Sequence, residues 1–371
     1  MTGDTLITPG ISRRAAETIA REIGTPAVVV DLDRVERNVA RLQAACDAAG
    51  LANRPHIKTH KSPFFAKMQI AAGARGITCQ KLGEAEMMVA AGIDDLLITY
   101  NVMGEATLER LSALLRPGPK LTLAADSAHT VNGLTLAAQQ AGRVLDVVIE
   151  CDTGRERAGV ATVAEAVALA GHISRVPALR FAGFMLYPPE TKWAETQVFF
   201  DEALAGVRTL GLDVDMVSTG GTPNLANLGK LRGASEHRAG TYIFNDRMMM
   251  GCGVAQAADV ALTVVSRVVS RGGADRGILD AGSKTLTADP GGGLDGYGHI
   301  IEHPQARIAR FAEEHGFLDL SRCNDRPAVG DVVRIVPNHV CVVVNMVDEL
   351  IAVRGDNIVA TIPVAARGRS R

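Results

Sequence analysis

The segment "RPHIKTHK", residues 54–61, brings three cationic side chains and two histidines together in the chain. In an extended strand the side chains of Arg54, His56, Lys58 and His60 point to one face, because successive residues alternate. A lysine beside other cations and apolar walls has a lowered pKa, which makes it a usable nucleophile. Lys58 is therefore a candidate catalytic residue, although a salt-bridged surface lysine also fits this pattern.

A histidine and a cysteine in the segment "PNHVCVVVNM" form a second candidate site. His339 and Cys341 are separated by one residue in a run typical of a strand, so we expect their side chains to face the same way. Imidazole and thiolate are good ligands for divalent metals such as zinc, and two protein ligands leave positions open for water or substrate. The alternative is a core cysteine beside a half-buried histidine. His315, in "EEHG", would lie near such a metal or in a solvated loop.

Strand-like runs, each followed by a helical segment, recur between residues 54 and 242. They are "RPHIK" (54–58), "GITCQ" (76–80), "LLITY" (96–100), "LTLAAD" (121–126), "DVVIECD" (146–152), "AGFMLY" (182–187), "MVSTGG" (216–221) and "HRAGTY" (237–242). Such alternation indicates parallel strands, and eight units of this kind predict an α/β fold with a (β/α)8 TIM-type barrel. An open doubly wound sheet is the alternative.

In a (β/α)8 barrel the functional side chains lie where the strands end, at the carboxyl face. Lys58 falls at the end of the first predicted strand, Arg157 follows the fifth and Tyr187 ends the sixth. The loops after the seventh and eighth strands, "STGGTPN" and "RAGTY", lie where barrels commonly bind a phosphate. A lysine, an arginine, a tyrosine and a phosphate site on one face suggest a phosphorylated cofactor held as a Schiff base.

Beyond about residue 255 the pattern changes to strand-like runs separated by turn residues, such as "DVVRIVP" and "ELIAVRGDNIVATIPV". "RGDN" is expected to be a hairpin turn. We predict two domains: a barrel over residues 33–250, and a mostly β domain over residues 251–371 that carries the metal pair. The N-terminal residues 1–32, with the apolar run at 27–30, are expected to complete the β domain.

The overall composition favours a small-molecule partner. The chain has 371 residues, a formal net charge of −2 and interspersed charges, which argues against broad binding of nucleic acid or membrane surfaces. The first residues contain no apolar core of signal-peptide length, and no run approaches the roughly 18 apolar residues of a membrane helix. The six cysteines are scattered without a CxxC pair, which is typical of reduced thiols. We therefore expect a cytoplasmic protein.

Several motifs taken together resemble the D-threonine aldolase/D-serine dehydratase family, whose members are pyridoxal-phosphate enzymes with an alanine-racemase-like barrel and a β domain. The motifs are "RPHIKTHK", "GITCQKLGEAE", "STGGTPN", "EHRAGTYIFND", "LDAGSK", "GYGHI", "EEHG" and "PNHVC". The resemblance runs from about residue 25 to the C-terminal "PVAARGR". The set of motifs together is specific for this family, whereas no single motif would be sufficient.

The resemblance implies roles for individual residues. Lys58 would be the Schiff-base lysine, and His60 a nearby acid/base group. The other residues that the resemblance places around pyridoxal 5'-phosphate are Gln80 and Arg157 at the ring, Tyr187 along the site, and Gly220, Gly221, Thr222 and Tyr242 at the phosphate. His339 and Cys341 would hold a divalent metal, with manganese, zinc, magnesium and cobalt as candidates. The roles of Lys61 and His315 stay open.

The resemblance leaves the reaction open between two lyase activities on a D-amino acid. Cleavage of D-β-hydroxy-α-amino acids to glycine and an aldehyde, as by D-threonine aldolase, is the first expectation. Dehydration of D-serine or D-3-hydroxyaspartate to a keto acid and ammonia is the second, because His-x-Cys is associated with the dehydratases and some aldolases carry His-x-Asp. A non-catalytic pyridoxal-phosphate-binding protein is a remote third, and a homodimer is the assembly expected by resemblance.

Overall fold

The computed structural model describes residues 8–371, which divide into two compact units. The barrel unit comprises residues 42–58, 63–240 and 368–371. The sheet unit comprises residues 59–62 and 241–367 together with the chain up to residue 41. Among residues 8–371 no helix combines the length and the apolar character needed to cross a membrane.

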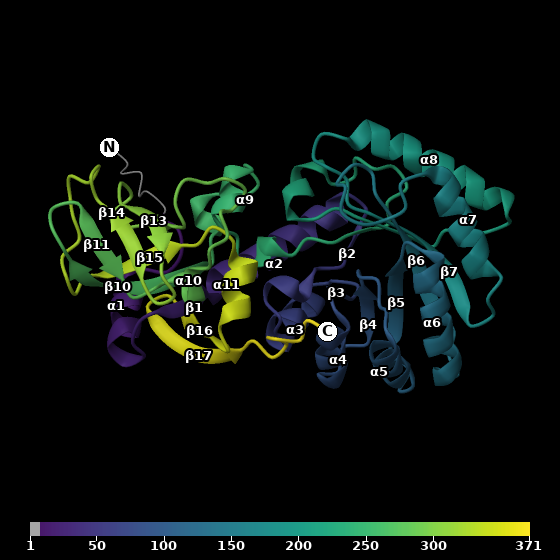
Figure 1. Ribbon diagram of the computed structural model, residues 1–371, viewed down its shortest axis with the longest axis horizontal. Coiled ribbons are helices and arrows are strands. Elements are labelled where there is room, and N and C mark those ends of the chain that lie inside the picture. Colours follow the sequence, from purple (N-terminus) through teal and green to yellow (C-terminus); the bar gives the residue numbers. More distant parts are fainter. Residues whose placement is uncertain (1–7) are drawn as a thin grey trace. The chain divides into compact units, whose positions relative to one another are not determined.

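Eight parallel strands form the barrel unit, in the order β2-β9-β8-β7-β6-β5-β4-β3 (Figure 1). Their bounds are β2 (Ala52–Asn53), β3 (Ile77–Cys79), β4 (Asp95–Ile98), β5 (Lys120–Ala125), β6 (Leu145–Cys151), β7 (Leu179–Leu186), β8 (Met216–Thr219) and β9 (Glu236–His237). A parallel bridge between His56 and Thr78 joins the two ends of this order and closes the ring. The predicted (β/α)8 barrel is confirmed, and the open-sheet alternative is wrong.

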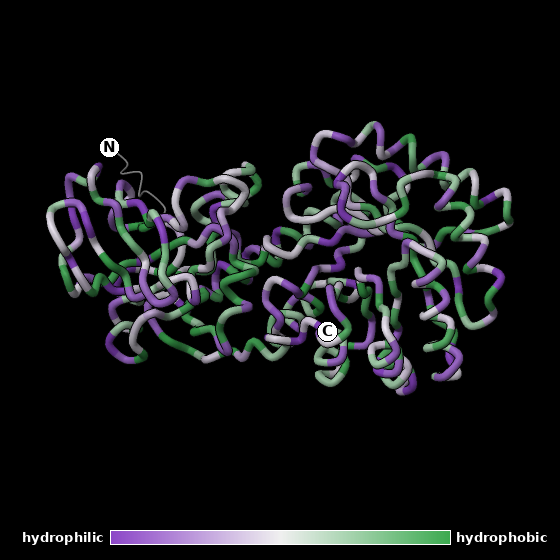
Figure 2. Tube along the Cα trace, in the orientation of Figure 1, coloured by the Kyte–Doolittle hydropathy of each residue, from purple (hydrophilic) through white to green (hydrophobic). Residues whose placement is uncertain are grey.

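Helices alternate with these strands, as the sequence pattern predicted. They are α3 (Pro63–Ala71), α4 (Leu82–Ala90), α5 (Glu105–Leu115), α6 (Ala128–Ala141), α7 (Val163–Ser174) and α8 (Trp193–Thr209). Local signals set their ends: Ser127 caps α6, which stops at Gly142 with a left-handed φ of 65°, and Thr162 with Glu165 forms a capping box on α7. Figure 2 shows hydrophobic and hydrophilic residues interleaved along these helices, as expected when one helical face is buried.

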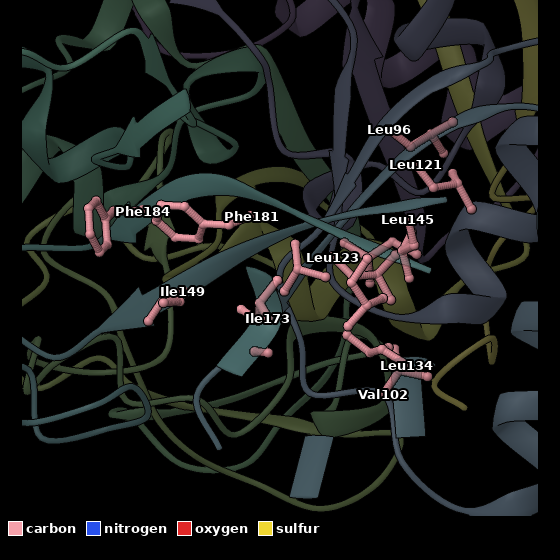
Figure 3. Packing of buried hydrophobic residues seen from close by; sticks show 14 of the residues in the cluster. Leu96, Val102, Leu121, Leu123, Leu134, Leu145, Ile149, Ile173, Phe181 and Phe184 are labelled. Atoms are coloured by element: carbon pink, nitrogen blue, oxygen red, sulfur yellow. The ribbon is translucent and has the colours of Figure 1, made fainter. Parts of the chain in front are cut away.

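The core of the barrel unit lies largely between strands and helices (Figure 3). Buried aliphatic residues of the strands pack there beside an aromatic group, in which the rings of Phe181 and Phe184 meet edge to face at 5.5 Å. Alternate residues of neighbouring strands form a separate cluster that includes Leu97, Ala124 and Ala182. Each fully buried leucine or phenylalanine side chain stabilises the fold by about 1.5–3 kcal/mol, so this packing dominates the stability of the unit.

A chain of buried polar groups runs through the barrel unit around Arg54. The Arg54 side chain is 1% exposed, and its Nε and Nη1 donate to Glu236 at 2.8 Å and to Asp95 at 2.5 Å. Asp95 also pairs with Lys120, and Glu236 accepts a hydrogen bond from the Ser218 hydroxyl. The expectation that Arg54 shares one strand face with Lys58 is therefore wrong. Strand β2 ends at Asn53, and Lys58 lies in a 3-10 turn, η1 (Ile57–Thr59).

Nine strands form the sheet unit, in the order β11-β14-β13-β12-β15-β10-β1-β16-β17 (Figure 1). They are β1 (Ala27–Asp31), β10 (Leu262–Arg271), β11 (Arg276–Leu279), β12 (His299–Ile300), β13 (Arg307–Phe311), β14 (Gly316–Asp319), β15 (Val332–Val336), β16 (Glu349–Arg354) and β17 (Asn357–Pro363). The N-terminal strand β1 pairs with β10 and β16, and Arg354–Asn357 forms the predicted hairpin turn between β16 and β17. The prediction of a mostly β C-terminal part is confirmed.

Short helices accompany this sheet. They are α1 (Arg13–Glu22), α9 (Arg247–Gly251), α10 (Ser283–Leu286) and α11 (Val340–Met346), while α2 (Leu32–Ala48) begins in this unit. The strand predicted for "HVCVVVNM" is wrong, because these residues form α11. Its buried residues Val340, Val343 and Val344 follow helical spacing, so burial of one helical face outweighs the strand preference of valine.

Replacing Arg54 with methionine should lower the free energy of unfolding by about 3–5 kcal/mol, because Glu236 is left buried without its cation. Adding Glu236→Gln should recover part of that loss, since the amide is neutral. Arg180→Met is the matched control: this half-exposed arginine also pairs with two carboxylates, Asp146 and Asp215, and its loss should cost less than about 1 kcal/mol. Urea unfolding of the four proteins checks this, and equal losses for Arg54 and Arg180 would contradict it.

Candidate active site

Lys58 lies in the 3-10 turn η1 of the barrel unit and is half-buried. Its backbone N–H donates to Nδ1 of His56 at 3.4 Å, and His56 Nε2 lies 3.2 Å from Oε1 of Gln80. Burial, then the charges of Lys58 and Arg238, hold the pKa of His56 well below its ordinary value. His56 is therefore neutral with its proton on Nε2, and it links the lysine turn to Gln80.

Tyr187 follows β7 between two arginines. The guanidinium of Arg155 lies 4.2 Å from the centre of the Tyr187 ring and that of Arg157 lies 5.4 Å from it. Arg157 Nη2 also lies 3.4 Å from the buried carboxylate of Glu150. Burial raises the pKa of the Tyr187 phenol, against the nearby arginine charges. The structure thus brings Arg157 and Tyr187 together, and Arg155 is a residue that the sequence reasoning missed.

The turn after β8 needs its glycines. Gly220 has φ +77°, and a Cβ there would lie 2.1 Å from the His237 ring. A Cβ on Gly221 would lie 2.8 Å from the Tyr187 ring. The Thr222 hydroxyl accepts a hydrogen bond from the backbone N–H of Gly240. The glycines therefore let the rings of His237 and Tyr187 pack against this turn, where any other residue would collide with them.

The barrel unit offers what the phosphate of pyridoxal phosphate requires. In the part of the chain that the structure describes, Thr219 Oγ1, Asn224 Oδ1 and His237 Nε2 are buried without a hydrogen-bond partner. All three flank the Gly220–Gly221 turn in the sequence or contact it. The Thr219 hydroxyl and the His237 Nε2–H can donate to a phosphate oxygen, whereas the Asn224 amide oxygen can only accept a hydrogen bond. These residues fit the cofactor that the resemblance implies.

His339 and Cys341 open helix α11 in the sheet unit, with His339 at the N-cap position. The Cys341 sulfur lies 3.2 Å from the Thr59 hydroxyl and 3.7 Å from that of Thr241. Burial opposes a charge on the His339 ring, but its hydrogen bond to Cys341 and the charges of Cys341 and Asp246 raise its pKa to about 9. The two side chains lie near each other because both belong to the first turn of a helix. They do not alternate along a strand, contrary to our prediction.

The donors of this pair suit a divalent metal. Imidazole nitrogen and thiolate sulfur are ligands for zinc and related ions. Within residues 8–371 no group of three or more His, Cys, Asp or Glu side chains is arranged to hold a metal ion. A metal on His339 and Cys341 would therefore have two protein ligands and keep its remaining positions for water or substrate.

Three residues around the metal pair escaped the sequence reasoning: Thr59, Thr241 and Asp246. Asp246 is fully buried, and burial raises its pKa to about 6. Asp246 is the last residue of the motif "EHRAGTYIFND" and directly precedes α9. Aspartate is a preferred N-cap residue, so this position could have been identified as a helix cap from the sequence. Thr59 stands between Lys58 and His60, but nothing in the sequence indicated that its hydroxyl would meet a cysteine.

The remaining predicted residues belong to the sheet unit. His60 is fully buried, and its Nδ1 accepts the backbone N–H of Ser62 at 3.1 Å. Lys61 donates to Asn345 at 2.8 Å, which gives it a structural role. Tyr242 is 2% exposed in the turn η3 (Thr241–Ile243), in a different unit from the Gly220–Gly221 turn. His315 is exposed just before β14.

The barrel followed by a β domain defines the alanine racemase fold class. Residues 30–248 match the family described as "Alanine racemase, N-terminal domain", and residues 261–353 match the "Putative serine dehydratase domain". Alanine racemase from Bacillus anthracis shares the fold, with a TM-score of 0.67 at 15% identity.

The particular family follows from closer relatives. The chain is 35% identical to a D-threonine aldolase of Arthrobacter, covering 94% of both chains, and 34% identical to a D-threo-3-hydroxyaspartate dehydratase of Delftia, covering 86% of this chain and 91% of that one. The crystal structure of D-threonine aldolase from Filomicrobium marinum superimposes with a TM-score of 0.86 at 32% identity, over 94% of this chain and 96% of that one. The chain belongs to this pyridoxal-phosphate-dependent family of D-threonine aldolases and D-hydroxyamino-acid dehydratases, which confirms the resemblance seen in the sequence.

His237 predicts a pH dependence of stability. Burial, then the charge of Arg238, lowers its pKa to about 3 in the folded protein, whereas an unfolded histidine titrates near 6.5. Below pH 6.5 the unfolded chain binds a proton that the folded chain does not, so stability should fall by about 1.4 kcal/mol per pH unit from this residue. Urea unfolding between pH 7 and pH 5 measures the slope.

His237→Gln should make that slope shallower by the same amount, because the glutamine binds no proton in either state. Replacing the exposed His315 with glutamine is the control and should leave the slope larger than in His237→Gln. An identical slope in the unaltered protein and His237→Gln would contradict the assignment of a neutral, buried His237.

Proposed function

We propose that this protein is a pyridoxal-phosphate- and metal-dependent lyase that cleaves D-β-hydroxy-α-amino acids between Cα and Cβ, giving glycine and an aldehyde. The observation that carries the metal-dependent lyase is the His339–Cys341 pair, which serves either reaction: two protein ligands leave metal positions open, and a substrate β-hydroxyl oxygen suits such a position. Relatives named as aldolases support the choice of reaction, since they include D-threonine aldolase and 3-hydroxy-D-aspartate aldolase of Paracoccus denitrificans.

The proposed cofactor residues have three roles: covalent attachment of the cofactor, orientation of its ring and binding of its phosphate. Pyridoxal phosphate, when bound, supplies an electron sink for negative charge at the substrate Cα. Lys58 would hold the cofactor covalently, while Gln80, Arg157 and Tyr187 orient its ring. Gly220, Gly221, Thr222 and Tyr242 are the proposed phosphate residues. Holding the ring in one orientation decides which bond to Cα stands perpendicular to it and therefore breaks.

The metal residues act on the β-oxygen of the substrate. A divalent metal supplies a Lewis acid that lowers the pKa of a bound hydroxyl. His339 and Cys341 would hold that metal, and the thiolate favours zinc over magnesium. Within the same unit the Thr59 hydroxyl lies 3.2 Å from the Cys341 sulfur and would support that ligand by a hydrogen bond.

His60 is the proposed acid/base group. Because its Nδ1 accepts the Ser62 N–H, a neutral His60 carries its proton on Nε2. Carbon–carbon cleavage takes a proton from the β-hydroxyl and adds one at Cα. His60 would pass a proton between these two positions through Nε2, so that the ring ends the reaction unchanged.

A dehydratase reaction is the second candidate, and one observation favours it. Solved structures of the Delftia dehydratase include a cysteine-to-alanine variant in the metal-free form and a histidine-to-alanine variant, at positions two residues apart. His339 and Cys341 have the same order and spacing. In that reaction His60 would give its proton to the departing hydroxyl group.

The two reactions differ in their products. The protein loaded with pyridoxal phosphate and Zn²⁺ or Mn²⁺ should convert D-threonine to glycine and acetaldehyde, and a chelator should abolish the activity. Glycine, aldehyde, keto acid and ammonia are measured with D-threonine, D-serine and D-threo-3-hydroxyaspartate as substrates. Keto acid and ammonia without any glycine would overturn the aldolase proposal in favour of the dehydratase.

Cys341→Ala is the matched variant for this assay. It should lose the activity and its response to added metal, because one of the two metal ligands is gone. Full activity of Cys341→Ala in the presence of the chelator would show that the reaction does not use the metal pair.

A further inference from the structure

We propose that Asp246 is a positioning residue: it turns His339 so that Nδ1 faces the protein and Nε2 is the nitrogen that binds the metal. The inference rests on the proposed function, because it concerns the same metal pair. It adds a residue that is not itself a ligand.

The Asp246 carboxylate is held in one orientation by backbone donors. One oxygen accepts the N–H of Met249 at 2.9 Å, which caps helix α9. The other oxygen accepts the N–H of Val340 at 3.0 Å. Val340 is the residue between His339 and Cys341, so this carboxylate fixes the backbone from which both ligands extend.

The same oxygen that accepts the Val340 N–H lies 3.8 Å from Nδ1 of His339. The sulfur of Met248 lies 3.1 Å from that nitrogen. Asp246 and Met248 therefore both lie on the Nδ1 side of the ring. The His339 side chain is 23% exposed while Asp246 is fully buried, which leaves Nε2 as the nitrogen directed away from these two groups.

A carboxylate beside Nδ1 affects the metal-binding properties of His339 as well as the local structure. Metal-binding histidines usually direct their second nitrogen to a carboxylate or carbonyl, which fixes the tautomer and makes the other nitrogen a better donor. Burying Asp246 costs free energy unless its charge is matched by hydrogen bonds and a cation. The N–H groups of Met249 and Val340 supply those hydrogen bonds, and the Nδ1–H of His339 lies close enough to add a favourable electrostatic contact.

The competing explanation is that Asp246 only caps α9. Asp246→Asn separates the two, because the amide oxygen still accepts one backbone N–H while the negative charge beside Nδ1 is gone. Affinity for Zn²⁺, measured by competition with a chelating dye, should fall about 10–100-fold. The visible absorbance of the lysine-bound cofactor should stay unchanged, since no cofactor residue is altered.

Ser12→Ala is the control for a lost helix cap in the same unit, since the Ser12 hydroxyl accepts the N–H of Ala15 at the start of α1. It should lower stability and leave Zn²⁺ affinity intact. Equal Zn²⁺ affinity of Asp246→Asn and the unaltered protein would overturn the inference while the proposed function stands. If the unaltered protein binds no Zn²⁺, the metal assignment fails and the inference fails with it.

A second measurement does not depend on folding of the Asp246 variant. In the Zn²⁺-loaded protein labelled with ¹⁵N-histidine, long-range proton–nitrogen correlation identifies the tautomer of each ring, and His339→Gln identifies the His339 signal by its loss. The expected result is a proton on Nδ1 and the metal on Nε2. A metal on Nδ1 would overturn the proposal.

Discussion

The buried ion pairs of Arg54 lie between the end of the first barrel strand and the turn that carries Lys58. Its guanidinium lies between Glu236 and Asp95 and is almost completely shielded from water. A charge in that place is tolerated because both partners are anchored on strands of the same barrel, Asp95 at the start of β4 and Glu236 at the start of β9. Four residues later the chain has left the strand, and Lys58 projects from a 3-10 turn.

The candidate site residues are oriented by neighbours of different chemical types. His56 is buried and neutral, and it connects the backbone of Lys58 with Gln80. The glycines after β8 allow the rings of His237 and Tyr187 to pack against that turn. At the start of α11, hydroxyl groups contact the thiol of Cys341 and a buried carboxylate contacts the ring of His339.

Much of the fold follows from sequence periodicity, and the misses have physical reasons. Branched aliphatic residues in "LLITY" and "DVVIECD" identified β4 and β6, because parallel strands are buried on both faces, whereas "RPHIK" and "HRAGTY" lie almost wholly beyond β2 and β9. The same rule failed for "VCVVVNM", where burial of Val340, Val343 and Val344 on one helical face outweighed the strand preference of valine. Arg54 was misplaced because its partners lie 41 and 182 residues away in the chain, beyond any local pattern.

The candidate site shows the same limit. Residue types and motifs pointed to Lys58, His339 and Cys341, but the neighbours that orient them could not be read from spacing. Thr59 contacts Cys341 across 282 residues, and Asp246 accepts from Val340 across 94. The types of the side chains can be read from the sequence. The orientation of these side chains depends on contacts between residues far apart in the chain, which form only in the folded protein.

The covalent link between Lys58 and the cofactor is the central claim, and borohydride reduction tests it most directly. Reduction turns the lysine–cofactor linkage into a stable bond, and mass spectrometry of the digested protein then locates the added pyridoxyl group. The account predicts the label on the peptide that contains Lys58 and none in Lys58→Ala. A label on another lysine, or an equally labelled Lys58→Ala protein, would contradict it.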